Sequence, residues 1–191
     1  KAQDGLTGNP TISSIVEGRK IWTPVGTVFS RNPAWIVYDF LTNTRYGVGV
    51  PQDLIDLDSF MASADYCDAL VEGEPRFTLD YIIDVQRPAV DHLQSMLACF
   101  RGYFLARDKI ELHVEQAGSI YKALGPDNFV KDSFSWWQKS GDDSPNRITL
   151  EWIDPDNHYE QSSAVFEHQE DIAARGVFEK SFSVLGITRS S

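Results

Sequence analysis

The pair Asn32-Pro33 is the clearest helix start in this chain of 191 residues, and it constrains the fold more than any other local feature. Asn is a favoured N-cap, and Pro at the first helical position presets φ without losing a needed N–H. The residues that follow recur at i, i+3, i+4 and i+7, the spacing of one helical face: Ala34, Val37, Tyr38 and Leu41. The sequence therefore predicts a helix over 33–43, ended by the positive φ of Gly47 or Gly49.

Three side chains of this helix region need partners beyond its apolar stripe. Trp35 and Phe40 lie off the stripe, so they require a second surface, supplied either by the rest of the chain or by another subunit. Arg45 follows the helix, and three interpretations of its side chain stay open. It bonds the last carbonyls of the helix, pairs with Asp39, or stays in solvent.

Two further helices are expected in the first half of the chain. The first has Asp58 as its N-cap and Gly73 as its stop. The second opens at Pro88 and stops at Gly102. Its apolar face is expected to comprise Val90, Leu93, Leu97 and Phe100.

The remaining segments show strand periodicity or turn signals. In the first part of the chain we expect two short strands around 17–20, a strand over 76–85 and a hairpin over 103–114. After them we expect a strand near 148–152, a turn at 154–157, a returning strand over 159–166, a short helix over 169–175 and a last strand over 177–185. No internal repeat is present. This order predicts an α+β fold of antiparallel hairpins and small sheets with three to four short helices.

The chain is long enough to bury a core without disulfides, and its 42% hydrophobic and 12% aromatic content excludes intrinsic disorder. Residues 1–10 are polar and are expected to form a loose linker. Residues 11–191 form the main unit. A division of that unit into two subdomains, about 11–55 plus 134–191 with 56–133 inserted, stays open.

Charge and residue spacing exclude several classes of function. A net charge of −11 disfavours nucleic-acid binding, and no apolar stretch is long enough to span a membrane. No nucleophile elbow, phosphate loop, dinucleotide fingerprint or zinc spacing is present. The neighbouring acidic residues occur at expected caps, turns and solvated faces: Asp56/Asp58, Asp142/Asp143, Asp154/Asp156 and Glu170/Asp171. We therefore expect no enzyme, no cofactor and no metal.

Three features keep two interpretations each. Asp154 and Asp156 either hold a calcium ion or form an Asx-stabilised turn. Cys67 and Cys99 are expected to be buried thiols, with a disulfide left open. The pair Trp136-Trp137 either fills a core or an interface or stacks on a sugar.

Four stretches carry a resemblance to a known family. They are TISSIVEGRKI (11–21), NPAWIVYDFLTNTRYGVG (32–49), NRITLEWIDPDNHY (146–159) and GITR (186–189). They resemble the host-specificity, or tip attachment, proteins of long-tailed bacteriophages and prophages, with Phe40 in place of a usual Leu. The positions that match the family's motifs are Glu17, Gly18, Arg19, Asn32, Pro33, Trp35, Asp39, Arg45, Tyr46, Gly47, Asn146, Asp154 and Pro155.

The resemblance implies a virion structural protein of the phage tail tip, assembled in the bacterial cytoplasm. Such proteins are trimers that close the tail tube and contact other tail proteins, and their hub portion is similar to baseplate-hub modules. They are several times longer than this chain, so the chain is expected to be a central segment. Host receptor contact is expected through C-terminal regions that lie outside it.

The resemblance also gives the acid excess a second interpretation. If the segment lines a tube through which DNA passes, negative charge prevents phosphates from sticking; ordinary solubility is the alternative. A function of a different class, a carbohydrate-binding or glycan-degrading tail module, predicts an exposed aromatic platform at Trp136 and Trp137 or a cleft with facing carboxylates.

Overall fold

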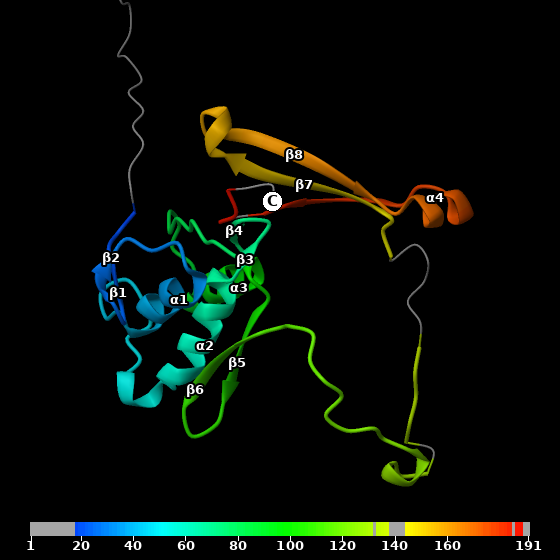
Figure 1. Ribbon diagram of the computed structural model, residues 1–191, viewed down its shortest axis with the longest axis horizontal. Coiled ribbons are helices and arrows are strands. Elements are labelled where there is room, and N and C mark those ends of the chain that lie inside the picture. The colour runs from blue at the N-terminus through cyan, green and yellow to red at the C-terminus, as the bar shows by residue number, and fades with distance from the viewer. Residues whose placement is uncertain (1–17, 132, 138–143, 185, 189–191) are drawn as a thin grey trace, which may run out of the picture.

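The computed structural model describes residues 18–131, 133–137, 144–184 and 186–188 (Figure 1). Three helices gather on one side of the molecule, next to three small hairpins. A three-stranded sheet extends away from them and carries a short helix at its far end. The helices are α1 (Pro33–Thr42), α2 (Leu57–Asp68), α3 (Ala89–Cys99) and α4 (Gln169–Arg175), with 3-10 turns η1 (Gln52–Leu54), η2 (Pro126–Asn128) and η4 (Pro155–Asn157).

The strands form four small sheets within the described residues. Three are antiparallel hairpins: β1 (Ile21–Thr23) with β2 (Gly26–Val28), β3 (Leu70–Val71) with β4 (Glu74–Pro75), and β5 (Gly102–Ala106) with β6 (Ile110–Val114). In the fourth, β7 (Arg147–Asp154) lies between antiparallel β8 (Glu160–Glu167) and parallel β9 (Glu179–Ser183). The α+β class is confirmed. The parallel pair β7–β9 departs from the antiparallel pairing that the sequence predicts, and the β3–β4 hairpin is an additional hairpin.

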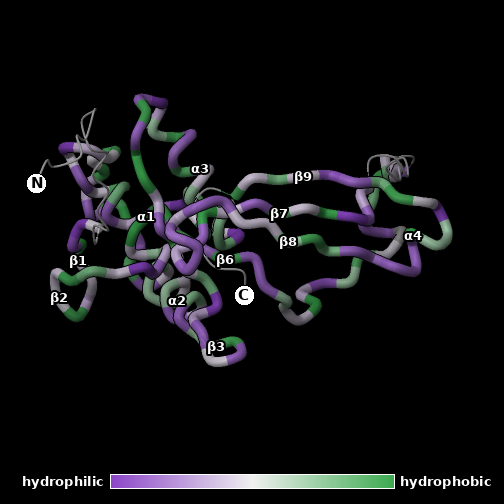
Figure 2. Tube along the Cα trace, turned by 90° about the horizontal axis from the view of Figure 1, so that it is seen from above, coloured by the Kyte–Doolittle hydropathy of each residue, from purple (hydrophilic) through white to green (hydrophobic). Residues whose placement is uncertain are grey.

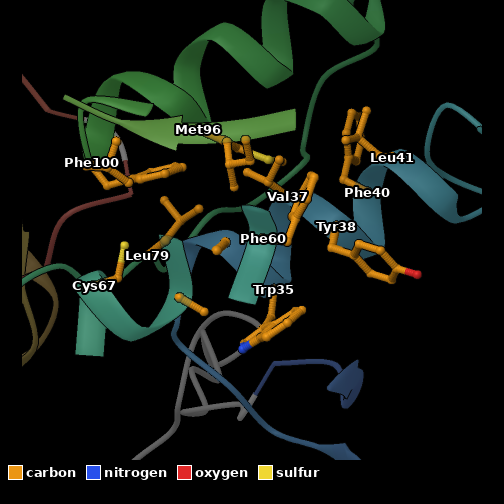
Figure 3. Packing of buried hydrophobic residues seen from close by; sticks show 14 of the residues in the cluster. Trp35, Val37, Tyr38, Phe40, Leu41, Phe60, Cys67, Leu79, Met96 and Phe100 are labelled. Atoms are coloured by element: carbon orange, nitrogen blue, oxygen red, sulfur yellow. The ribbon is translucent and has the colours of Figure 1, made fainter. Parts of the chain in front are cut away.

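The hydrophobic core lies between α1, α2, α3 and β6 (Figure 3). Phe60, Phe100 and Leu112 are completely buried there. Trp35 and Phe40, which lie off the main stripe of α1, are also buried by the rest of this chain. Trp35 meets Trp22 edge to face at 6.1 Å, and Phe40 meets His92 at 6.1 Å. Intrachain packing therefore supplies the second surface of α1.

Both expected boundaries of α2 are wrong, and Gly102, the expected stop of α3, is instead the first residue of β5. Asp56 rather than Asp58 caps α2, because its carboxylate accepts a hydrogen bond from the Ser59 amide at 3.1 Å. The helix ends at Asp68, and Gly73, with φ +94°, serves the β3–β4 turn instead. Two acidic residues two positions apart both fit the N-cap preference, so composition does not distinguish them.

The predicted apolar face of α3 is confirmed at three of its four residues, since Phe100 is completely buried and Leu93 and Leu97 pack against the core. The helix buries His92, Met96 and Cys99, whereas Val90 is exposed. His92 is a polar residue at a core position: its Nδ1 lies 3.0 Å from the Tyr81 hydroxyl. A periodicity that counts only apolar residues cannot include such a histidine.

The strand predicted over 76–85 is also wrong. This segment joins none of the sheets that the described residues form. The Leu79 amide donates to the Arg31 carbonyl, and the Asp80 amide to the Gly186 carbonyl. Only the first part of the alternating pattern is packed: Leu79 lies in the core with Phe77 and Tyr81 against it, whereas Ile83 and Val85 are exposed.

The second half of the chain follows the sequence closely. The hairpin over 103–114, the strand, turn and return over 147–167, the helix over 169–175 and a strand within 177–185 are confirmed. The strand expected before residue 17 and the linker 1–10 lie outside the described residues. The strand expected after residue 20 is β1, and its observed partner is β2. The subdomain division stays a prediction.

The β7–β9 sheet reaches away from the helices as a narrow ribbon (Figures 1 and 2). Trp152 is its buried hydrophobic residue, whereas Ile153, Val165, Phe166 and Phe182 are exposed. Among the described residues, no helix combines the length and the apolar character that crossing a membrane requires.

Candidate interaction surface

The motif residues at the start of α1 connect two helices. Asn32 is buried; its Oδ1 accepts a hydrogen bond from the Ala34 amide at 3.0 Å, and its Nδ2 donates to the Ala64 carbonyl of α2 at 2.9 Å. Pro33 occupies the first helical position and Trp35 packs in the core. These residues therefore fix both where α1 begins and how α2 lies against it.

The motif residues at the end of α1 fold the chain back onto the helix. The Val48 amide donates to the Phe40 carbonyl at 2.9 Å, and the Val50 amide to the Leu41 carbonyl at 2.8 Å. A Cβ atom at Gly47 would lie 1.9 Å from the Phe40 oxygen, so no other residue fits there. Gly47 is required by space rather than by a positive φ.

A contact joins the first two motif stretches. The Tyr46 hydroxyl donates to the Asp39 carboxylate, and the Arg19 guanidinium lies over the Tyr46 ring at 4.9 Å. Burial, together with this hydrogen bond, raises the pKa of Tyr46 to about 12. Pairing of Arg45 with Asp39 is wrong, since Asp39 takes Tyr46 as its partner and the Arg45 side chain is exposed. Gly18 lies beside the ring of Phe29, and Glu17 lies outside the described residues.

A polar cluster that the sequence did not predict joins the last motif stretch to the core. Arg31 binds Asp80 through two nitrogens and donates to the Thr188 hydroxyl at 2.8 Å. Thr188 in turn donates to Asp80. A Cβ atom at Gly186, whose φ is +87°, would lie 2.8 Å from Leu79. The only sequence signal for this cluster was the family-like GITR ending, since Arg31 and Asp80 are 49 residues apart.

Asn146 organises the far end of the ribbon. Its Nδ2 donates to Asp171 at 3.0 Å and to the Gly176 carbonyl at 2.8 Å, and its Oδ1 accepts from the Phe178 amide at 2.8 Å. Hydrogen bonds from Arg175 and Asn146 lower the pKa of Asp171 to about 2. A single buried amide thus holds α4 against the start of β7 and β9.

Asp154 and Pro155 form the opposite turn. Asp154 accepts hydrogen bonds from the Asp156 amide and the Ser162 hydroxyl, both at 3.0 Å. Both carboxylate oxygens of Asp154 are therefore used by protein donors, as an Asx-stabilised turn requires. Within the described residues, no group of three or more His, Cys, Asp or Glu side chains could hold a metal ion.

Two glutamates lie near one another on the ribbon. Glu167 and Glu179 line an open hollow with Arg147 and Val165. Arg147 lies 2.5 Å from Glu167 and 3.8 Å from Glu179. A glycosidase needs two carboxylates that face a substrate bond, whereas these two share one guanidinium.

Trp136 and Trp137 project into solvent, with 76% and 82% of their surfaces exposed. Their interpretation as core residues is therefore wrong for this chain, and the interface and sugar-stacking interpretations both remain. They belong to a longer exposed apolar segment, which we call the aromatic arm. The arm is defined by Ile120, Tyr121, Leu124, Phe129, Val130, Phe134, Trp136 and Trp137, all of which are exposed.

A shallow groove lies between α2 and the β5–β6 hairpin. We call it the α2 groove; its volume is about 260 Å³. It is lined by Ser59, Ala62, Ser63, Tyr66, Tyr103, His113, Val114, Glu115 and Gln116. The rings of Tyr103 and His113 stack at 5.7 Å, and the Arg76 guanidinium lies 4.5 Å from the centre of the Tyr66 ring.

Most of the described motif residues thus serve helix ends, turns and packing, whereas Arg45 is exposed. Comparison with known proteins agrees with the resemblance that the motifs carry. The chain is 26% identical over 171 residues to tip attachment protein J of Escherichia phage SECphi27, a match that covers 85% of this chain and 14% of that protein. It is 23% identical over 172 residues to tip attachment protein J of Escherichia phage SECphi4, covering 85% and 15%.

These relatives confirm the resemblance to phage tip attachment proteins. No family model matches the chain. The chain spans 14–15% of the length of these curated relatives.

Proposed function

We propose that this chain is a structural segment of a phage tail tip, part of the central hub that links the tail tube to host-attachment parts. The similarity to two tip attachment proteins over 85% of the chain is the observation that carries the proposal. The roles of the motif residues support it. Asn32, Gly47 and Asn146 each hold a helix or turn in place. The segment performs no reaction in this proposal and acts by assembly.

In the proposed assembly the chain forms a homotrimer in the virion, contacts other tail proteins and is put together in the bacterial cytoplasm. Host receptor contact belongs to other regions of the protein. The exposed apolar side chains of the aromatic arm and of the ribbon support contacts with other subunits. The net charge of −11 supports a tube wall that lets DNA pass without binding it.

Immunoelectron microscopy tests the location. An antibody raised against this chain, applied to virions of the phage that encodes it, is expected to label the tail tip. Label on the capsid or along the tail tube, or virions that lack the chain in mass spectrometry, would contradict the proposal. The charge argument has its own test: a trimer structure with acidic residues on the outside and a neutral or basic bore would refute it.

Exposure of Trp136 and Trp137 also favours a second candidate, a carbohydrate-binding tail module. A glycan array combined with a cell-wall hydrolysis assay distinguishes the two. The structural proposal expects neither binding nor hydrolysis. Glycan binding that is lost in the Trp136→Ser/Trp137→Ser variant would establish the second candidate.

A further inference from the structure

The aromatic arm exposes more apolar surface than a single chain can use. Tyr121 is fully exposed, Ile120 is 89% exposed and Val130 is 79% exposed. In Figure 1 the chain leaves β6, runs away from the helices past η2, and returns to the ribbon beside α4. The arm is thus presented away from the core, where the described part of the chain offers it no cover.

The size of this surface matches that of a protein interface. An aromatic side chain buries roughly 150–250 Å² when it is covered. The five aromatic residues of the arm therefore offer on the order of 700 Å² at their observed exposures, close to the roughly 800 Å² that one partner contributes to a standard interface. This area favours a macromolecular partner over a single sugar.

The charge of the arm differs from that of its surroundings. Residues 116–137 contain two lysines, Lys122 and Lys131, and two aspartates, so the segment is neutral in a chain of net charge −11. Residues 53–74 instead contain seven acidic residues and no lysine or arginine. They include α2, whose sequence places Asp58 and Asp65 seven residues apart, close to one face of the helix. Both side chains are exposed.

The α2 groove adjoins this acidic face. Ala62 and Tyr66 line the groove from the same helix, one turn beyond Asp58 and next to Asp65. On the opposite wall Glu115 adds a carboxylate, and Tyr103 presents an exposed aromatic ring. The groove volume of about 260 Å³ lies just below the roughly 300–1,000 Å³ of small-molecule pockets. The groove therefore fits one large aromatic side chain better than an oligosaccharide.

We propose that the aromatic arm of one copy of this chain docks in the α2 groove of a second copy. A tryptophan of the arm fills the groove, and Lys122 and Lys131 face Asp58 and Asp65. The partner is a second copy because both the arm and the groove carry aromatic side chains, and because the arm's two lysines can pair with the exposed Asp58 and Asp65 beside the groove. The arm as a whole is neutral, so it approaches an acidic molecule without like-charge repulsion. An arm-to-groove contact joins two different surfaces, so it closes into a ring or extends as a chain of subunits.

This proposal rests on the structural role proposed above and gives it a specific contact. The first test uses a photo-crosslinking amino acid, p-benzoylphenylalanine, at position 137 in a mixture of ¹⁴N- and ¹⁵N-labelled chains. Crosslinks between differently labelled copies that map to residues 59–66 or 103–116 are expected. Crosslinks confined to one copy, crosslinks between copies at other sites, or no crosslinks would overturn the proposal.

The second test measures self-association by sedimentation equilibrium. Trp136→Ser/Trp137→Ser is expected to raise the dissociation constant at least ~10-fold, since buried tryptophans dominate interface energies. Val25→Ser, at an 87% exposed position in the β1–β2 turn, is the matched control and should leave it unchanged. Circular dichroism confirms that both variants are folded. Equal association of the two variants would contradict the proposal.

Charge reversal provides the third test. Lys122→Glu/Lys131→Glu and Asp58→Lys/Asp65→Lys should each weaken self-association, whereas a mixture of the two variants should associate, because each then offers the opposite charge to the other. Failure of the mixture to associate would contradict the charge pairing. Tail-tip labelling in virions is a separate readout: if it persists while all crosslinks between copies are absent, the docking proposal fails and the structural role stands.

Discussion

The carbonyl oxygen of Phe40 leaves no room for a side chain at Gly47. Gly47→Ala is therefore expected to lower the free energy of unfolding by roughly 2–4 kcal/mol, because the backbone must move to relieve the clash. Urea denaturation followed by circular dichroism measures the change. Gly118→Ala is the control, since no atom lies within 4 Å of its Cβ position, and it should change stability by less than about 0.5 kcal/mol. Equal effects would mean that the turn after α1 tolerates a side chain.

The two buried thiols make stability depend on alkaline pH. Burial raises the pKa of Cys67 from 9.0 to about 12 and that of Cys99 to about 11. A thiol that keeps its proton to a higher pH in the folded state than in the unfolded state stabilises the fold. This stabilisation is complete below the pKa of the unfolded state and is lost as the pH rises toward the pKa of the folded state. The free energy of unfolding should therefore fall between pH 9 and pH 11, and Tyr46 adds a fall of the same sign toward pH 12.

The double variant Cys67→Ala/Cys99→Ala tests this dependence. It should be less stable at pH 7.5 because it loses buried volume, yet its stability should fall less steeply between pH 9 and pH 11. Urea titrations at pH 7.5, 9 and 10.5 measure both effects. A slope equal to that of the parent chain would show that the thiols do not titrate as argued.

At the level of elements, α4 depends on the side chain of Asn146. Asn146→Ala removes the acceptor of the Phe178 amide and the donor to the Gly176 carbonyl. Each bond of this kind is worth about 1 kcal/mol, so amide hydrogen exchange in 176–178 should accelerate by at least about tenfold.

Hydrogen exchange with mass spectrometry reads this change. Ser162→Ala is the matched control, because it removes one hydrogen bond from the opposite end of the ribbon and should leave 176–178 unchanged. If both variants accelerate exchange there, the ribbon opens as one unit and Asn146 has no local role.

The elements that the sequence predicts well are those whose partners are near in sequence. The hairpin over 103–114 and the pair β7–β8 are each set by a short turn and an alternating pattern, so both are found as expected. The segment 76–85 shows the same alternation but has no adjacent strand; its amides bond to Arg31 and Gly186, which no local pattern indicates. His92 was missed as a core residue because its partner Tyr81 is a tertiary contact.

One part of the candidate interaction surface could also be predicted from the sequence, and another part could not. Trp136 and Trp137 were identified from sequence as an interface or sugar platform, and their exposure agrees with either. The α2 groove was not predicted, because its walls come from helix and hairpin residues that are far apart in sequence, such as Tyr66 and Tyr103, which are separated by 37 positions. Adjacency of this kind becomes visible only once the elements are packed.

For the whole molecule, the cluster of Arg31, Asp80 and Thr188 ties the last described residues to the core. Thr188→Val keeps the shape of the side chain but removes two hydrogen bonds, so we expect a loss of about 1–2 kcal/mol of stability. Exchange of the Asp80 amide, which bonds to the Gly186 carbonyl, should accelerate. Thr27→Val, at an exposed position of β2, is the control and should have neither effect. Unchanged exchange at Asp80 in Thr188→Val would show that the tie is made by the backbone alone.

The chain departs from the core just after Glu115, whose amide bonds to the Arg101 carbonyl, and rejoins it at Gly186. Topologically, the arm and the ribbon are one long insertion between two fixed points. Each doubling of the length of a flexible loop costs only about 0.6 kcal/mol of closure entropy. Within this insertion the arm, residues 116–137, carries none of the four family-like stretches, whereas the ribbon carries 146–159. Evolution can therefore lengthen, trim or exchange the arm while the three-helix framework keeps its shape, which makes the arm the natural place for sequence divergence between viruses that meet different neighbours.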